Sequence, residues 1–276
     1  MAGLSEYRDR VAVVTGASSG IGAELARELG RRGSRVALVA RRRERLEQLA
    51  GEIREAGGRA SVHVCDVAER IEVAKAAEAV LAEWGAVDLL VNNAGYVRHV
   101  LFKNHDVDDI ERMMRTNYLG AVYWIKAVLP QMSERGSGWI VNISSFAGII
   151  PQPDEAAYAA TKFALTGLSE SIVYELEPLG IHVLAVHPVL VRTEMFSPEV
   201  IARMPPAGLK QFIEAPEFVR ETVRALERGE HTLVVPRRFR AVHVLRTLFP
   251  RSVGRTIARV KLKALPDSPQ RARRSD

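Results

Sequence analysis

A strand, a glycine-rich turn and a helix follow one another near the start of the chain. Residues 10–15 form a short apolar run that is typical of a buried parallel strand. The run leads into Thr15-Gly16-Ala17-Ser18-Ser19-Gly20-Ile21-Gly22, and residues 23–29 then have a helical pattern. This order brings backbone N–H groups and a helix N-terminus to one point, which attracts phosphate. The stretch therefore predicts a dinucleotide-binding α/β unit.

The glycines of this turn have distinct predicted functions. Gly16 allows the sharp turn, Gly20 lets a pyrophosphate approach the backbone, and Gly22 lets the helix pack close to the sheet. The predicted cofactor site in this turn also includes Ser18, Ser19 and Ile21.

The end of the second predicted strand, residues 35–40, bears on the choice between NAD and NADP. An NAD site usually has an acid here for the ribose hydroxyls, whereas an arginine accommodates the 2′-phosphate of NADP. Ala40 stands about where the acid would be, and Arg41 follows it directly. We therefore expect NADP(H) to be preferred over NAD(H). The alternative is that the run Arg41-Arg42-Arg43 only solvates the next helix.

Polar residues follow the next two predicted strands, at the sheet edge where ligands of open α/β sheets bind. Asp66 could hydrogen-bond an adenine, or it could cap a helix that starts near Glu69. The run from Asn92 to Gly95 could tie neighbouring strand ends together and leave room for a ribose, or it could be an Asn-rich turn. The predicted cofactor site at these strand ends comprises Asp66, Val67, Asn93, Ala94 and Gly95.

Tyr158 and Lys162 are four residues apart, so on a helix they share one face. A nearby ammonium favours tyrosinate, and we therefore expect the pKa of the phenol to fall from about 10 towards working pH. Such a tyrosine can pass a proton to or from a substrate oxygen. Ser145 precedes it by thirteen residues.

Asn117 interrupts a long helical pattern over residues 107–132. Because Asn is mildly unfavourable inside a helix, this position needs a reason. Asn117 could bend the helix through a water and link the lysine to solvent, or it could lie on a solvated outer face.

Together these motifs resemble the short-chain dehydrogenase/reductases, in their compact single-domain branch. The resemblance rests on Thr-Gly-x-x-x-Gly-x-Gly, Asn-Asn-Ala-Gly, Asn117, Ser145 and Tyr158-x-x-x-Lys162 in this order. It covers residues 8–195, and residues 230–236 look like the family's last strand. The resemblance implies an α/β fold, a doubly wound Rossmann-type parallel sheet of about seven strands with helices on both faces.

The resemblance also implies the chemistry, which is hydride transfer between a nicotinamide and a ketone, aldehyde or alcohol. By position, Tyr158 would be the acid/base, and Lys162 would bind the nicotinamide ribose and lower the tyrosine pKa. Ser145 would hydrogen-bond the substrate oxygen, and Asn117 would hold the water of a proton relay. Two hydroxyl donors aimed at that oxygen would stabilise its developing negative charge.

One position departs from the family pattern. After the sixth predicted strand the family usually has Pro-Gly, whereas this chain has Pro188-Val189. The missing glycine restricts the backbone near the nicotinamide amide. Thr193 still stands where the family places a hydroxyl on the cofactor phosphates. We expect Pro188, Val191 and Thr193 to bind the cofactor, above a reshaped pocket floor.

The segments expected around the substrate are mostly apolar. They include Phe146 and Ile149 before Tyr158, and Met195, Phe196 and Met204 in a predicted lid. These segments contain no cluster of Arg or Lys that could bind a phosphorylated substrate, so we expect a hydrophobic ketone or secondary alcohol. The alternative is that the lid residues merely pack on the body.

The C-terminal segment is strongly basic. Residues 231–276 contain twelve Lys/Arg against two Asp/Glu, whereas the remaining residues contain twenty-seven against thirty-one. The pattern from residue 237 predicts two amphipathic helices broken at Pro250. Such helices could lie on an anionic membrane, at about 1 kcal/mol per basic residue, or pack on the body or on a second subunit. No pattern typical of nucleic-acid binding accompanies the charge.

Three parts of the chain are therefore expected: a catalytic domain at 1–236, a basic helical extension at 237–265 and a disordered tail at 266–276. A 47% hydrophobic fraction is sufficient for a sizeable core. The single cysteine, Cys65, has no partner in a metal-ligand spacing, so we expect a structural thiol and no metal site. No signal-peptide pattern or long apolar run occurs, which predicts a cytoplasmic protein that is peripheral at most. The family implies a homodimer or homotetramer.

Two alternatives to an oxidoreductase are a non-catalytic cofactor-binding protein and an enzyme that does not consume the cofactor. A non-catalytic NADP(H)-binding sensor or scaffold would be expected to have lost Tyr158 or Lys162, and both are present with Ser145. An isomerase or dehydratase of the same fold would usually carry a larger C-terminal substrate domain. The oxidoreductase is therefore the favoured prediction.

Overall fold

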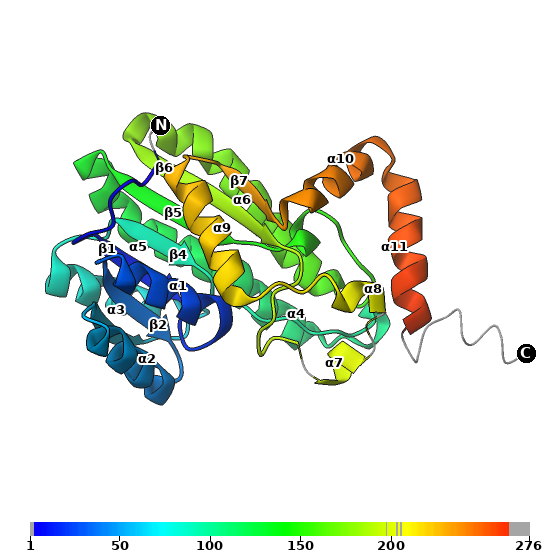
Figure 1. Ribbon diagram of the computed structural model, residues 1–276, viewed down its shortest axis with the longest axis horizontal. Helices are drawn as coiled ribbons and strands as arrows, with labels where there is room; N and C mark the ends of the chain where they lie inside the picture. Colours follow the sequence, from blue (N-terminus) through cyan, green and yellow to red (C-terminus); the bar gives the residue numbers. More distant parts are fainter. Residues whose placement is uncertain (1–2, 197, 203, 205, 265–276) are drawn as a thin grey trace, which may run out of the picture.

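Seven parallel strands form one sheet in the order β3-β2-β1-β4-β5-β6-β7 (Figure 1). The computed structural model describes residues 3–196, 198–202, 204 and 206–264. The strands are β1 Val11–Thr15, β2 Arg35–Ala40, β3 Arg59–Val64, β4 Leu89–Asn92, β5 Gly138–Ile143, β6 Ile181–Pro188 and β7 Thr232–Val235. The predicted doubly wound Rossmann-type fold is confirmed.

The order of the strands reverses between β1 and β4, which pair with each other in the middle of the sheet. The chain continues from β1 to β2 on one side of this point and from β4 to β5 on the other, so the loops after β1 and β4 separate and open a crevice. Both strands are fully buried, as their continuous apolar runs predict. The crevice therefore lies directly above the predicted glycine-rich turn.

The edge strand β3 is less buried than the strands in the middle of the sheet. Five of its six residues are half-buried or exposed, because only β2 pairs with it. Cys65, which follows the strand, is nevertheless buried, and burial raises the pKa of its thiol to about 12. A thiol with this pKa stays protonated near neutral pH, as expected of a structural cysteine.

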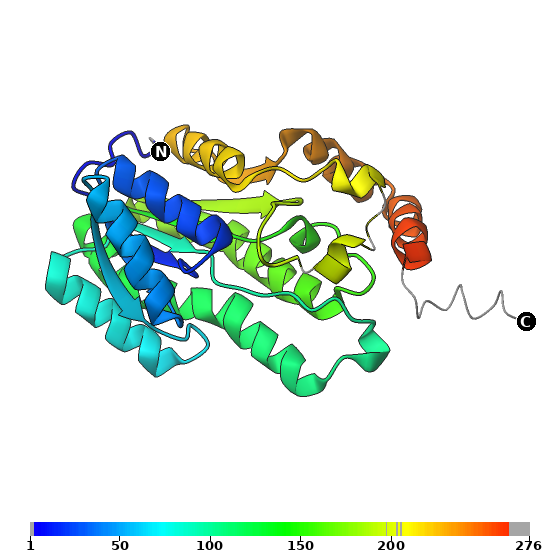
Figure 2. The ribbon, with the colours of Figure 1, turned by 60° about the horizontal axis from the view of Figure 1, so that its bottom comes forward.

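Helices cover both faces of the sheet (Figure 2). One apolar core joins the sheet to α1 Gly20–Arg31, α2 Arg43–Glu55 and α9 Ala215–Glu227. The opposite core joins it to α3 Arg70–Trp84, α5 Gly120–Arg135 and α6 Ala156–Leu176. Shorter elements are η1 Phe102–Asn104, α4 Val107–Met114, η2 Arg115–Leu119, η3 Phe146–Gly148 and η4 Glu177–Leu179.

The segments after β6 and β7 lie beyond the carboxyl ends of the strands (Figure 1). The connection between β6 and α9 carries α7 Pro198–Ala202 and α8 Pro206–Leu209. The chain after β7 forms η5 Arg237–Phe239, α10 Arg240–Leu248 and α11 Pro250–Ala264. The two predicted tail helices and their break at Pro250 are confirmed. Residues 266–276, predicted to be disordered, lie outside the described residues. Among the described helices, none combines the length and apolar character that crossing a bilayer requires.

Candidate active site

A cavity of about 610 Å³ opens at the carboxyl ends of the strands. This volume falls within the range of roughly 300–1,000 Å³ that is typical of ligand sites. The predicted site residues that line it are Gly16, Ser18, Ser19, Gly20, Ile21, Arg41, Asp66, Val67, Asn93, Ala94, Gly95, Ser145, Tyr158, Pro188, Val191 and Thr193. Gly22, Asn117 and Lys162 are not among the lining residues and support the wall from behind.

The glycine-rich turn has the backbone that only glycine adopts readily. Gly16 and Gly20 both have positive φ, at 64° and 56°. A Cβ on Gly22 would lie 2.4 Å from the Gly16 carbonyl oxygen, so a side chain there would push the helix from the strand. Ser19 precedes α1 without a side-chain capping hydrogen bond, and the first turn of α1 contains no acid. The N–H groups of this turn can therefore meet an anion.

The end of β4 is tied to the end of β1 by side chains. Asn93 Nδ2 donates to the Thr15 carbonyl at 3.0 Å, and the Thr15 hydroxyl accepts from the N–H groups of Asn93 and Ala94. Asn92 Nδ2 donates to Asn142 Oδ1 at 2.9 Å, which links β4 to β5. The prediction that these asparagines tie neighbouring strand ends together is confirmed.

The arginine closest to the glycine-rich turn is Arg42, which the sequence interpretation missed. Its guanidinium donates to the Ser18 and Ser19 hydroxyls at 2.8–3.1 Å. Arg41, the predicted residue, also lines the cavity and lies 3.7 Å from the Asp66 carboxylate. The run of three arginines after Ala40 indicated that an arginine would lie near this turn. The sequence positions alone could not show which of the three it would be.

Asp66 does not cap a helix, because α3 begins at Arg70 and its N-cap residue is Glu69. Its carboxylate accepts from the Ala68 N–H at 3.1 Å and lies near Arg41 and Arg112. The capping alternative is wrong, and Asp66 stands at the wall of the cavity.

Ser145, Tyr158 and Lys162 meet between the end of β5 and the start of α6. Tyr158 and Lys162 are buried, and the Lys162 ammonium lies 5.8 Å from the centre of the tyrosine ring. Lys162 Nζ donates to the Ile143 carbonyl at 2.8 Å. Ser145 hydrogen-bonds the Tyr158 phenol and accepts from the Ala147 N–H. These three residues have thus been brought together as predicted.

The predicted lowering of the Tyr158 pKa is wrong for this structure. Burial raises the pKa well above its usual value, the hydrogen bond from Ser145 acts in the opposite direction, and the Glu155 carboxylate raises it further. Lys162 does not offset burial, because its ammonium is held at the Ile143 carbonyl and burial lowers its own pKa to about 8. A lysine with this pKa gives up a proton readily near neutral pH.

Asn117 is buried within the π-helical segment η2, which joins α4 to α5. Its side chain accepts from the Tyr96 N–H at 3.0 Å and donates to the Tyr96 carbonyl at 2.9 Å and to Thr161 Oγ1 at 3.1 Å. Asn117 therefore distorts the helix where it ties the chain after β4 to α6, as π-bulges at functional sites do. The alternative of a solvated outer face is wrong.

Gly95 separates Asn117 and Lys162 from the cavity. A Cβ there would lie 3.1 Å from Asn117 Oδ1 and 3.5 Å from Lys162 Nζ. The missing side chain leaves space directly beside the two polar groups.

His187 holds the Ser145 backbone and was not predicted from the sequence. It is fully buried in β6, and its Nδ1 donates to the Ser145 carbonyl at 3.2 Å. Burial lowers its pKa to about 4, so the ring is neutral and the carbonyl partner fixes the proton on Nδ1. A histidine inside an apolar strand was the signal that could have identified it.

The departure from the family pattern, Val189, packs against a buried cluster that the tail also contacts. Val189 N–H donates to the Val235 carbonyl at 2.9 Å, and its side chain packs against the buried cluster that contains Phe146 and Val234. Phe239 and Val242 of the tail pack against the same cluster. Thr193 lies close to Gly20, since a Cβ on that glycine would be 3.1 Å from its methyl group. The effect of Val189 on the pocket floor stays a prediction.

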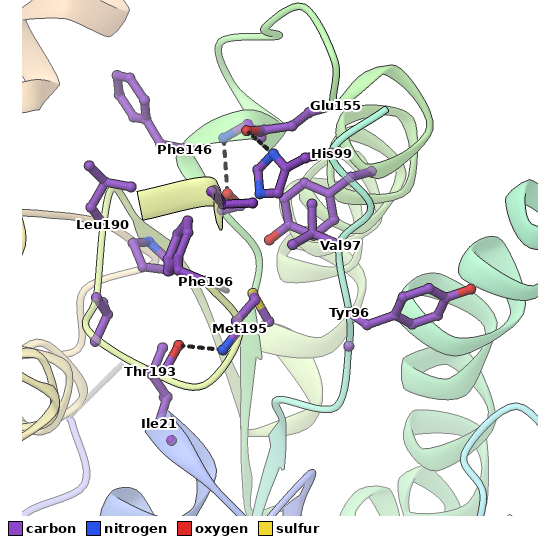
Figure 3. A pocket seen from close by; sticks show the side chains of 18 of the residues that line it. Ile21, Tyr96, Val97, His99, Phe146, Glu155, Leu190, Thr193, Met195 and Phe196 are labelled. Carbon is purple, nitrogen blue, oxygen red and sulfur yellow. Dashed lines mark hydrogen bonds and ion pairs between the residues drawn. The ribbon is translucent and has the colours of Figure 1, made fainter. Parts of the chain in front are cut away.

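The two ends of the cavity differ in character (Figure 3). Ile21 and Thr193 lie at the end near the glycine-rich turn, and His99 and Glu155 lie at the other end. Apolar side chains from several segments line the remainder, namely Val97, Phe146, Leu190, Met195, Phe196, Met204, Phe239, Val242, Ile257 and Val260. The described part of the predicted lid therefore faces the cavity, and the tail contributes to its wall.

The residues at the end of the cavity near the glycine-rich turn fit a dinucleotide with a 2′-phosphate. Gly16, Gly20 and Gly22 provide the close backbone approach, and Gly95 leaves space beside Lys162. Arg41 and Arg42 line the cavity after β2, where Ala40 replaces an acid.

Comparison with known proteins points to one family. Its sequence model, described as short chain dehydrogenase, matches residues 10–202. An uncharacterized oxidoreductase of Mycobacterium tuberculosis is 41% identical over 199 residues, which are 70% of this chain and 58% of that protein. The chain thus spans little more than half the length of the first curated relatives it matches. A fatty acyl-CoA reductase of Acinetobacter baylyi is 36% identical over 72% of this chain and 68% of its own length.

Solved structures are similar over a larger share of the chain than these relatives. A metagenomic short-chain oxidoreductase in complex with NADP matches with a TM-score of 0.71 and 34% identity, over 83% of this chain and 98% of its own. Among the similar solved structures, some contain NADP or NADPH and others contain NAD.

Proposed function

Since the chain belongs to the short-chain dehydrogenase/reductase family, we propose that it is an NADP(H)-dependent oxidoreductase that interconverts a ketone or aldehyde with the corresponding alcohol. The observation that carries this proposal is the meeting of Ser145, Tyr158 and Lys162 at the wall of a cavity that also contains a dinucleotide-type turn. A sensor or scaffold would not need this set of residues.

When bound, the nicotinamide would supply or accept the hydride. In the reducing direction, Tyr158 gives its phenolic proton to the substrate oxygen as the carbonyl carbon gains the hydride. Ser145 donates a hydrogen bond to the same oxygen and so stabilises its developing charge. In the oxidising direction the phenolate accepts the proton of the alcohol.

Tyr158 must then regain or release its proton, and Lys162 is suited to this task. Burial lowers the pKa of Lys162 to about 8, so its ammonium can exchange a proton near neutral pH. Asn117 lies behind Gly95 next to the lysine, at the distorted turn of the helix. We assign Asn117 the positioning of this relay, and its hydrogen bonds to Tyr96 and Thr161 fix it in place.

The preference for NADP(H) rests on the charge at the end of β2. Arg41 and Arg42 line the cavity, and Arg42 is held at the Ser18 and Ser19 hydroxyls. A guanidinium beside a phosphate-binding turn favours the cofactor that carries an additional phosphate.

The substrate is proposed to be hydrophobic. The cavity wall around Phe146, Leu190 and Phe196 is apolar, and these side chains come from both the lid and the segment before Tyr158. An apolar substrate would gain about 25 cal/mol per Å² of surface that it buries there.

The direct test is the turnover of small and bulky ketones and alcohols with NADPH and NADH side by side. Tyr158→Phe should lose at least about 10²-fold in kcat, because the proton donor is gone, while the Kd for NADPH stays within about twofold of wild type. A variant that retains wild-type turnover would contradict the assignment of Tyr158. Tight NADPH binding without turnover by the wild type would favour the sensor.

The tail also presents a surface to a partner. Exposed apolar side chains here are Val244, Leu245 and Leu248 of α10 and Phe249, which follows it, and Arg251 beside them is also exposed. We propose an anionic membrane surface as the partner, since apolar side chains flanked by arginines suit its interface. Cosedimentation with phosphatidylglycerol vesicles should fall when Phe249 is changed to Ser. If the wild type instead forms a dimer that Phe249→Ser dissociates, the partner is a second copy of the chain.

A further inference from the structure

The tail helix α11 turns one face to the cavity. Thr256, Ile257, Val260 and Lys261 all line it, and their spacing places them on one side of a helix. Arg255 precedes Thr256 and Arg259 lies between Ile257 and Val260, and both arginines are exposed. Thr256 and Val260 are also exposed and lie at the rim of the cavity, whereas Ile257 and Lys261 are half-buried. Helix α11 thus turns Ile257 and Lys261 to the cavity and its arginines to solvent.

A second part of the tail packs close to the catalytic serine. Phe239 meets Phe146, the residue after Ser145, in an edge-to-face contact with ring centres 5.6 Å apart. Ile257 and Val242 pack against the same buried cluster, which contains Ile149 and Ile150. The tail therefore covers the segment that joins Ser145 to Tyr158.

Two basic residues of the tail fasten this same segment. Arg246 of α10 donates to the Ile149 carbonyl at 2.7 Å. Lys261 of α11 donates to Glu155 Oε1 at 2.8 Å and lies 3.4 Å from Asp154 Oδ1. Both contacts join residues that are about a hundred positions apart in the sequence. They therefore hold the tail helices against the segment that joins Ser145 to Tyr158.

The carboxylates that Lys261 meets are buried. The side chains of Asp154 and Glu155 are only 5% and 10% exposed, against 25% for Lys261. Two buried carboxylates are costly without a cation, and removing the cation from such a group is strongly destabilising. Lys261 and His99 are the described basic groups within ion-pair distance of this pair, and His99 carries charge only when protonated. The ion pairs with Asp154 and Glu155 thus stabilise Lys261, and with it α11, in this position.

We propose that α11 is the substrate-selecting wall of the active site, locked by Lys261 onto Asp154 and Glu155, and that it contacts the apolar body of a bulky carbonyl or alcohol substrate. This inference rests on the proposed oxidoreductase function. A small substrate needs only the region around Ser145 and Tyr158, whereas a long one must extend along the apolar wall that Ile257 and Val260 complete (Figure 3 shows Glu155 and His99 at this end).

The first test measures the lock without any ligand. Hydrogen–deuterium exchange is compared in the full chain for wild type, Lys261→Met, Lys261→Arg and Arg259→Met. Lys261→Met should speed exchange in α11 and in residues 146–155 about tenfold or more, because it leaves two buried carboxylates without their cation. Lys261→Arg should restore slow exchange. Arg259→Met, which removes a cation from the solvent face of the same helix, is the matched control and should not change it.

The second test measures substrate selection with cyclohexanone and a long-chain methyl ketone, each variant at its own pH optimum. Ile257→Trp fills the cavity face and should raise the KM for the long ketone about tenfold or more, with the KM for cyclohexanone within about twofold. The Kd for NADPH should not change. Lys261→Met should affect the long ketone in the same selective way.

The outcomes separate this inference from the proposed function. If Lys261→Met and Arg259→Met behave alike in exchange, or if Ile257→Trp affects both ketones equally, α11 is not the selecting wall. If the wild type turns over neither ketone, the proposed function fails. In that case calorimetry measures the binding of the long ketone to the NADPH-loaded chain. Weaker binding by Ile257→Trp than by the wild type would still support α11 as the selecting wall, and equal binding would contradict it.

Discussion

The cofactor preference is tested most directly at Arg42. The guanidinium of Arg42 donates to the Ser18 and Ser19 hydroxyls, which lie in the glycine-rich turn, and its side chain is 45% exposed. Arg42→Ala removes this group and leaves the backbone N–H groups of the turn intact. The loss should therefore fall on a cofactor with a 2′-phosphate and spare one without it.

The magnitude follows from the exposure of the guanidinium. A hydrogen bond to a charged group contributes about 1.5–3 kcal/mol, and solvent at a half-exposed arginine favours the lower half of that range. About 1.5–2 kcal/mol corresponds to a rise of roughly 10–30-fold in the Kd for NADPH. The Kd for NADH should change less than about threefold, because the ribose hydroxyls present no anion to the arginine.

The neighbouring arginines provide the controls. Arg41 and Arg42 each lie near a carboxylate, Asp66 at 3.7 Å and Glu194 at 3.6 Å. Because only Arg42 is shown to donate to the Ser18 and Ser19 hydroxyls, Arg41→Ala should have a smaller effect than Arg42→Ala. Arg43 lies 3.7 Å from Glu47 of the same helix and does not line the cavity, so Arg43→Ala should leave both Kd values unchanged.

The assay is titration of each variant with NADPH and NADH by cofactor fluorescence, at one fixed ionic strength because salt screens exposed charges. Equal weakening of both cofactors by Arg42→Ala would refute the reasoning. So would a larger loss in Arg43→Ala than in Arg42→Ala.

Three further predictions follow from buried groups around the site. Burial is the main cause of the raised Tyr158 pKa and Glu155 adds to it, so Glu155→Gln should lower that pKa. Since alcohol oxidation needs the phenolate, the rise of kcat/KM with pH should then move to lower pH, and a move to higher pH would contradict this. Asn117→Ala should cost about 2–4 kcal/mol in urea unfolding, because the Tyr96 N–H and carbonyl lose their partner; a change below about 0.5 kcal/mol would contradict the positioning of Asn117. Gly22→Ala places a Cβ 2.4 Å from a backbone oxygen and should abolish NADPH binding, whereas Gly51→Ala, with open space on α2, should stabilise the chain by about 0.5–1 kcal/mol. Cofactor titration and urea unfolding of the two glycine variants check this contrast.

The sequence was sufficient for the parts of the site that depend on local patterns. Continuous apolar runs identified β1, β2 and β4 because buried parallel strands leave little choice of residue. The glycine-rich turn could be located because its backbone requires glycine at positive φ. The helical spacing of Tyr158 and Lys162 placed both on one face of α6.

Other parts of the site depend on contacts between distant segments and could not be predicted. The choice between Arg41 and Arg42 depends on how β2 approaches the Ser18–Ser19 turn. The direction of the Tyr158 pKa depends on burial by surrounding elements, which outweighs a lysine four residues away.

The tail illustrates the same limit. Its helices and their break could be read from the pattern of apolar and basic residues. Whether the apolar face of α11 meets a membrane, a subunit or the cavity depends on contacts such as that between Lys261 and Glu155, which are 106 positions apart.

That separation also sets an order of events during synthesis on the ribosome. At about 5–20 residues per second, Lys261 is made roughly 5–20 s after Glu155, and domains fold from the N-terminal side as they emerge. Strands β1 to β5 and the glycine-rich turn precede Glu155, so this part of the sheet can begin to assemble while α11 has not yet been translated. The contact of Lys261 with Glu155 therefore closes last, over a site whose walls are already in place.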